Sequence, residues 1–82
     1  MSESLDFGAF SRRVAEFLGK DPSAITRPIH LYDDLGLDSL GMFSLGMYVI
    51  KCFGITLPLS EVATIATLGD LYDALDRHRP TA

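Results

Sequence analysis

Apolar side chains recur at helical spacing near the start of the chain. Phe10, Val14 and Phe17 lie three or four residues apart within residues 5–18, and charged residues occupy positions between them. This pattern is typical of an amphipathic helix with one face turned towards a core. Gly19 follows and is well suited to cap the C-terminal end. We therefore expect a first helix over residues 5–18.

A second run of apolar residues follows Asp38 and Ser39, two residue types that cap helix starts. The run ends with a Phe-Gly pair at residues 53–54, a combination that commonly stops a helix. These start and stop residues predict a second helix of about four turns. By helical spacing its core-facing residues are Leu45, Val49 and Phe53.

The C-terminal third of the chain predicts two more helices. A short helix fits residues 61–63, which follow Pro58. Thr67 and Asp70 then have the spacing of a capping box, with Asp in place of the usual Glu. An apolar stripe at helical spacing follows them and ends before Pro80. We expect the last long helix to begin at this capping box.

Residues 20–36 keep neither a helical nor a strand period for long and contain two prolines. We expect a long ordered loop that Ile25, Ile29 and Leu35 anchor into the core. Residues 55–57 have strand propensity, but a lone strand has no pairing partner. The sequence therefore predicts an all-α fold: a small four-helix bundle of three longer helices and one short one, with a long loop between the first two.

Length, charge and cysteine content narrow the class of protein. The 82 residues, 48% of them hydrophobic, suit one compact core, so residues 1–82 are expected to form a single domain. A net charge of −4 disfavours non-specific binding to nucleic acid or anionic membrane and favours partners with basic surfaces. The single Cys52 excludes an internal disulfide, and no His and Cys cluster offers metal ligands.

Targeting features also narrow the location. The first residues are acidic, unlike those of a signal peptide, and no apolar run approaches the roughly 20 residues that a membrane-spanning helix needs. We expect a free-standing, monomeric chain in the cytoplasm.

Residue types that often catalyse reactions form no convincing set. His30 lies in a loop near proline and His78 lies near the C-terminal end, and a domain of this size has little room for a catalytic cleft around either. We expect both histidines to be exposed or locally hydrogen-bonded. Cys52 is expected to be an inert packing residue.

The segment of residues 33–40 combines features that suit a covalent modification. It places the Ser39 hydroxyl at the first turn of a helix, where the helix dipole favours an attached phosphodiester. Asp38 can cap the helix and also offer a carboxylate to a modifying enzyme. Gly36 allows the loop to turn sharply. A plain helix cap would explain Asp38 and Ser39 alone.

The sequence Leu-Gly-Leu-Asp-Ser-Leu at residues 35–40 resembles the attachment motif of acyl carrier proteins. Ile-Thr at residues 25–26, Phe-Gly-Ile at 53–55 and Thr-Leu-Gly-Asp-Leu at 67–71 lie at family-like spacing, so the resemblance covers about residues 5–75. It implies a non-catalytic carrier with 4'-phosphopantetheine on Ser39, which a phosphopantetheinyl transferase would take from coenzyme A. Asp38 would help that transferase to recognise the site.

The resemblance also implies how such a carrier works. The thiol of the arm would hold an acyl group as a thioester and present it to acyl-transferring, condensing or modifying enzymes at high effective concentration. The motif does not name the acyl group, and fatty acid, polyketide and other acyl-transfer pathways all fit.

The second helix departs from the family pattern. Members usually carry acidic residues along it, whereas residues 40–53 contain none and Lys51 is their only charged residue. We therefore expect an apolar docking face for partner enzymes, for which methionine is well suited. The alternative explanation of these apolar residues is that the whole helix is buried more deeply than usual. The expected partner-binding residues are Leu40, Ser44, Met47, Ile50 and Lys51.

Two other functions stay open at this point. A peptidyl or aryl carrier protein uses the same serine chemistry, but such domains commonly have Gly-His-Ser where this chain has Leu-Asp-Ser at residues 37–39. The second possible function is that of an unmodified helical adaptor that only binds protein. The unusual second helix favours a specialised biosynthetic pathway over general fatty acid synthesis.

Overall fold

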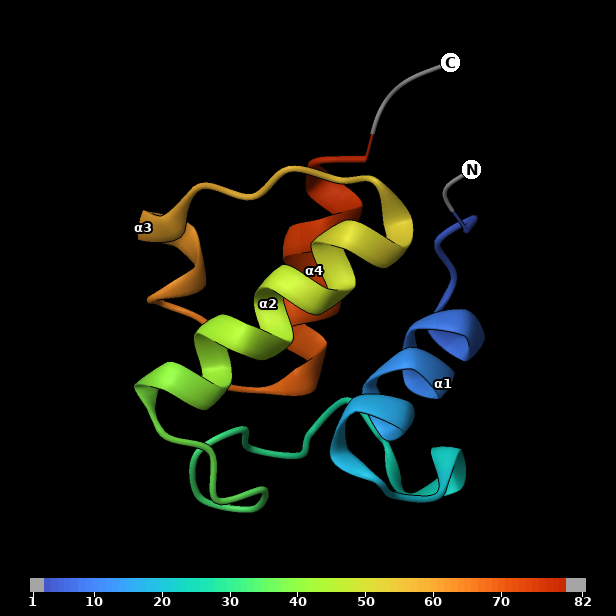
Figure 1. Ribbon diagram of the computed structural model, residues 1–82, viewed down its shortest axis with the longest axis vertical. Coiled ribbons are helices and arrows are strands. Elements are labelled where there is room, and N and C mark those ends of the chain that lie inside the picture. Colours follow the sequence, from blue (N-terminus) through green and yellow to red (C-terminus); the bar gives the residue numbers. More distant parts are fainter. Residues whose placement is uncertain (1–2, 80–82) are drawn as a thin grey trace.

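The computed structural model describes residues 3–79 and is helical (Figure 1). Helix α1 spans Phe7–Leu18, α2 Ser39–Phe53, α3 Leu59–Val62 and α4 Leu68–Arg77, and a 3-10 turn, η1, spans Pro22–Ala24. Among the described residues the only β pairing is an isolated bridge between His30 and Thr67. The predicted four-helix, all-α fold is therefore confirmed. No helix within residues 3–79 is long and apolar enough to cross a membrane.

Local capping sets the ends of α1 and α4. Asp6 accepts a hydrogen bond from the Ala9 N–H at 2.8 Å, so α1 begins at Phe7, two residues later than predicted. At its other end Gly19 takes the left-handed conformation, with φ of 69°. At α4 the predicted capping box is present, because Thr67 and Asp70 each accept a hydrogen bond from the other's backbone N–H.

The core fills the space between α1, α2 and α4, and α2 crosses in front of α4 in Figure 1. Each of these helices contributes fully buried side chains, and the α2 residues predicted to face inwards, Leu45, Val49 and Phe53, are all buried. Small Gly46 is buried as well. Fully buried core residues include Phe10 and Val14 of α1, Leu45 and Val49 of α2, and Leu71 and Leu75 of α4.

The loop between α1 and α2 is tied to the rest of the fold along its length. Ile25 is buried as predicted, while Ile29 and Leu35 are half-buried against the core. The deepest anchor is Leu31, which the sequence pattern did not single out and which is fully buried. Its backbone N–H donates to the Ala66 carbonyl at 2.8 Å. The loop is therefore fixed to the segment that precedes α4, and it delivers the chain to the start of α2.

Helix α3 is a single turn held close to α2. Val62 is its buried residue, and a Cβ added to Gly46 would lie 3.5 Å from Val62 Cγ1, an ordinary contact. Glu61 forms an ion pair with Arg77 and a hydrogen bond with His78 at the end of α4. A short helix with no side-chain cap is thus positioned from both sides by tertiary contacts.

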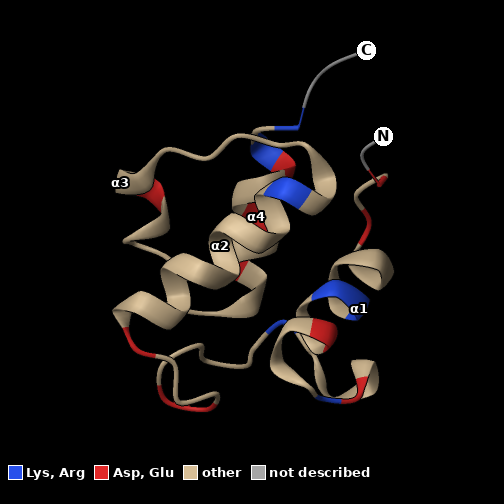
Figure 2. Ribbon diagram, viewed as in Figure 1, with Lys and Arg blue, Asp and Glu red and all other residues tan. Residues whose placement is uncertain are grey.

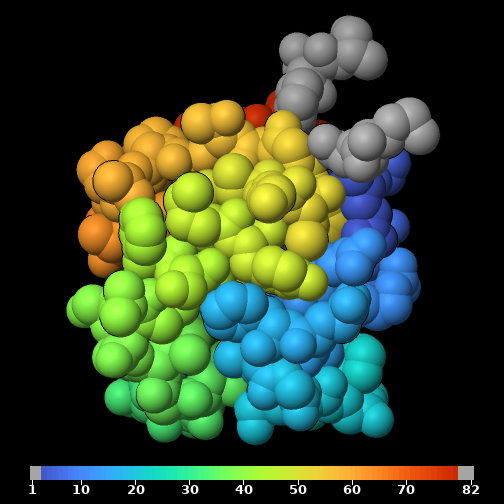
Figure 3. Space-filling view, viewed as in Figure 1, coloured from blue at the N-terminus to red at the C-terminus, as the bar shows by residue number. Residues whose placement is uncertain are grey.

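Charge is unevenly distributed over the molecule (Figure 2). Acidic residues gather in the loop before α2, while α2 itself is uncharged until Lys51. In the space-filling view α2, in green to yellow, forms the middle of one face between α1 in blue and the α3 region in orange (Figure 3). A largely uncharged helix therefore lies open on this face.

Candidate functional site

Ser39 is the first residue of α2, and its side chain is exposed. Asp38, just before it, has an extended backbone, and its Oδ1 accepts a hydrogen bond from the Gly41 N–H at 2.7 Å. Asp38 thus caps α2 while its carboxylate stays at the surface beside the serine. The arrangement leaves the Ser39 hydroxyl accessible at the positive end of the helix dipole.

Two glycines shape the approach to this serine. Gly36 has a φ of 69°, a left-handed conformation that a side chain would strain, and it turns the chain towards α2. A Cβ added to Gly41 would lie 3.1 Å from Asp38 Oδ1 and 3.3 Å from Leu37 Cδ2. Gly41 therefore makes room for the cap and for Leu37.

The acidic loop before α2 is organised around His30. The His30 backbone N–H donates to Asp34 Oδ2 at 2.7 Å, and His30 Nδ1 accepts from the Asp33 N–H at 3.1 Å. The side chains of Asp33 and Asp34 are exposed. His78 is exposed, and its Nε2 lies 2.6 Å from Oε2 of Glu61 in α3. His30 is therefore locally hydrogen-bonded and His78 is exposed, the two environments that the sequence led us to expect.

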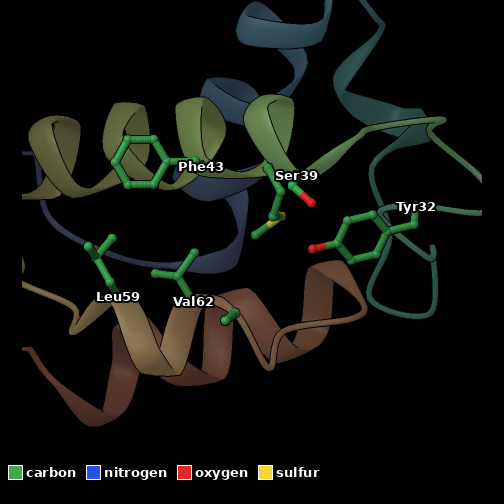
Figure 4. Close-up of a pocket in the computed structure, with 7 residues that line it drawn as sticks. Tyr32, Ser39, Phe43, Leu59 and Val62 are labelled. Carbon is green, nitrogen blue, oxygen red and sulfur yellow. The ribbon is translucent and has the colours of Figure 1, made fainter.

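A hollow of about 350 Å³ opens next to Ser39, between α2 and α3. Figure 4 shows Tyr32 and Ser39 at one end of it, with the Tyr32 hydroxyl pointing inwards, and Phe43 opposite Leu59 towards the other end. The hollow thus has a polar end at the serine and an apolar end between the helices. Its lining residues are Tyr32, Ser39, Met42, Phe43, Leu59, Val62 and Ala63.

The residues expected to bind partners share the open side of α2. Leu40, Ser44, Met47 and Lys51 are exposed, while Ile50 is half-buried against the core. Deeper burial of the whole helix is therefore excluded as the explanation of its apolar character. That partners bind these residues stays a prediction.

Two exposed apolar residues on this side were missed by the sequence analysis. They are Phe43 on α2 and Leu59 on α3. Phe43 lies three residues after Leu40 and four before Met47, so helical spacing alone was enough to find it. Leu59 required knowledge of where α3 packs.

Comparison with known proteins finds a matching family model and similar solved structures. The family model described as "Phosphopantetheine attachment site" matches residues 9–75. Among solved structures, a proposed acyl carrier protein from Mycobacterium tuberculosis is similar, with 31% sequence identity and a TM-score of 0.78 over 87% of this chain and 95% of that one. A match of this extent to a family defined by covalent 4'-phosphopantetheine, together with the shared fold, shows that the chain belongs to the acyl carrier protein family.

Proposed function

We propose that Ser39 carries the 4'-phosphopantetheine arm of this carrier protein and that residues 9–75 work as a single carrier domain. The observation that carries the proposal is the exposed Ser39 hydroxyl at the first position of α2, beside the Asp38 carboxylate and the mouth of the hollow. Ser44, the other serine of this helix, is exposed but lies more than a turn away from the cap.

The residues around Ser39 fit a phosphodiester-linked arm. Backbone N–H groups at a helix start and the positive end of the helix dipole favour a phosphate at this position. The carboxylate of Asp38 is engaged with the Gly41 N–H, which limits its repulsion of that phosphate. The Tyr32 hydroxyl, at the polar end of the hollow, can hydrogen-bond to the amides of an arm that starts at Ser39.

When bound, the arm supplies a thiol that holds an acyl group as a thioester. The apolar end of the hollow, between Phe43 and Leu59, would shelter an apolar acyl chain from water. An apolar cargo favours fatty acid, polyketide or a related specialised biosynthesis over the transfer of amino acids. The enzymes that act on the cargo would approach from the open side of α2.

Intact-mass measurement tests the attachment site. Incubation with coenzyme A, Mg²⁺ and a broad-specificity phosphopantetheinyl transferase should add the mass of one phosphopantetheine to the wild-type chain. Ser39→Ala should abolish the gain, and the matched control Ser44→Ala should keep it. A gain that survives in Ser39→Ala, or an unchanged wild-type mass with several active transferases, would contradict the proposal.

A further inference from the structure

The side chain of His30 caps the turn that leads from the loop to α2. Its Nδ1 accepts hydrogen bonds from the backbone N–H groups of Tyr32 at 3.3 Å and Asp33 at 3.1 Å. Its carbonyl accepts the N–H of Asp34 at 2.9 Å. A side chain that accepts from the second and third residues after it has the role of a helix N-cap, for which asparagine, aspartate and serine are the usual residues. Histidine differs from asparagine and serine because its acceptor nitrogen can be protonated near neutral pH.

The turn that His30 caps sets the approach to the attachment site. The N–H of Leu37 donates to the Leu31 carbonyl at 3.2 Å, which closes the turn directly before the Asp38 cap. The turn also carries Tyr32, whose hydroxyl points into the hollow at the end where Ser39 lies (Figure 4). The conformation of the turn therefore determines both the path of the chain into α2 and the polar end of the hollow.

The acceptor role of His30 Nδ1 requires a neutral imidazole. Both donors are backbone N–H groups, so a proton on Nδ1 would abolish both hydrogen bonds. Histidine side chains change charge between about pH 5 and 8. The His30 side chain is 34% exposed, so protons from solvent can reach it. The cap is therefore complete only while the imidazole is neutral.

A nearby carboxylate gives the protonated imidazole an alternative partner. The titratable side chains of the elements packed around His30 are Tyr32, Asp33 and Asp34 of the loop and Asp70 of α4. Asp34 accepts the His30 backbone N–H, and Asp70 accepts backbone N–H groups of the segment that pairs with His30. Asp33 Oδ2 lies 3.7 Å from Nδ1. Protonated His30 would thus exchange two backbone hydrogen bonds for an ion pair with Asp33.

We infer that His30 is a positioning residue for the attachment site: its neutral imidazole holds the turn that leads to Ser39, and its protonation releases that turn. The functional part of this inference rests on the proposed attachment at Ser39. Leu31 is fully buried and hydrogen-bonded to Ala66, so the release is confined to residues 32–36 and leaves the fold intact. Modification of Ser39 is then coupled to pH through the carrier itself.

Amide NMR of the unmodified protein between about pH 5 and 8 tests the release directly. The protection of the Tyr32 and Asp33 N–H groups against hydrogen exchange should fall by about tenfold as His30 becomes charged, because each loses its acceptor. His30→Asn supplies a cap that does not titrate, so it should keep the protection at every pH. His30→Ala should lack the protection at every pH. His78→Asn, which removes the other histidine, is the matched control and should behave as wild type.

The kinetics of modification supply the functional readout, with the same broad-specificity transferase as probe. Dividing the kcat/KM of wild type by that of His30→Asn at each pH cancels the transferase's own pH dependence. This ratio should be near one at about pH 8 and fall about threefold or more by about pH 5.5. The same ratio taken between wild type and His78→Asn should stay constant. Circular dichroism and thermal unfolding verify that each variant is folded.

Two results would overturn the inference. Protection of the Tyr32 and Asp33 N–H groups that does not change with pH, or that changes equally in His30→Asn, would exclude the release of the turn. A constant kcat/KM ratio between wild type and His30→Asn would exclude the positioning role. Absence of any wild-type modification would instead defeat the attachment at Ser39, and the NMR measurement would still decide whether protonation of His30 releases the turn.

Discussion

Substitution of Asp38 separates helix capping from enzyme recognition. In the structure one oxygen of this carboxylate accepts the Gly41 N–H at 2.7 Å, and the carboxylate is exposed beside Ser39. Asp38→Asn keeps an oxygen acceptor of similar capping strength and removes the charge, whereas Asp38→Ala removes both. The two variants therefore change stability and recognition to different degrees.

The expected magnitudes follow from the cap. Loss of one exposed N-cap hydrogen bond costs about 1 kcal/mol, so Asp38→Ala should lower the Tm by about 4–8 °C for a domain of this size. Asp38→Asn should stay within about 2 °C of wild type because asparagine caps as well as aspartate. If the transferase uses the carboxylate, both variants should be modified much more slowly than wild type, and to a similar extent.

Thermal unfolding followed by circular dichroism gives the Tm values, and intact mass over time gives the modification rates. Modification of Asp38→Asn at the wild-type rate would mean that the charge has no role in recognition. A Tm of Asp38→Ala equal to that of wild type would refute the energetic role of the cap. Slow modification of Asp38→Ala alone would assign the effect to a disturbed start of α2.

Three further predictions concern stability. Gly46→Ala should stabilise the fold by up to about 1 kcal/mol, because alanine favours a helix and the new Cβ lies at an ordinary contact distance from Val62. Gly41→Ala should give no such gain, because its new Cβ would lie unusually close to its neighbours. Urea unfolding of the two variants compares their free energies of unfolding. The hydrogen bond from Arg77 lowers the pKa of Glu61. The difference in free energy of unfolding between wild type and Glu61→Gln should therefore be largest well above pH 4.5, and it should decline as the pH falls through the lowered pKa. A difference independent of pH, in urea unfolding at several pH values, would contradict the role of the Glu61 charge.

The sequence predicted features that depend on local chemistry. Gly19, Gly54 and the Thr67–Asp70 capping box end or start helices through contacts within a few residues, and the structure has each of them. The start of α1 was placed two residues early because Asp6, and not the apolar pattern, begins the helix.

Features that depend on distant parts of the chain were missed. The burial of Leu31 results from its pairing with Ala66, far along the sequence, and no local pattern indicates that pairing. The hollow and the exposure of Leu59 depend on where α3 packs against α2. The role of Gly41 was not predicted, since its contact with Leu37 requires the folded loop.

The apolar character of α2 was visible in the sequence, but the sequence did not show whether its apolar residues are buried or exposed. Periodicity allowed either a deeply buried helix or an open apolar face. The structure shows that Leu40 and Met47 are exposed while Leu45 and Val49 are fully buried. Exposure is a tertiary property, so it required the packed arrangement of the neighbouring helices.

The central claim, that Ser39 is the residue which carries the prosthetic arm, is tested most directly by locating the added mass within the chain. The wild-type protein is incubated with coenzyme A and the transferase, and fragmentation mass spectrometry is applied to the peptide that contains Ser39 and Ser44. The account predicts that all fragments which include Ser39 carry one phosphopantetheine and that fragments starting at Leu40 carry none. An added mass on Ser44, or on any residue other than Ser39, would contradict it.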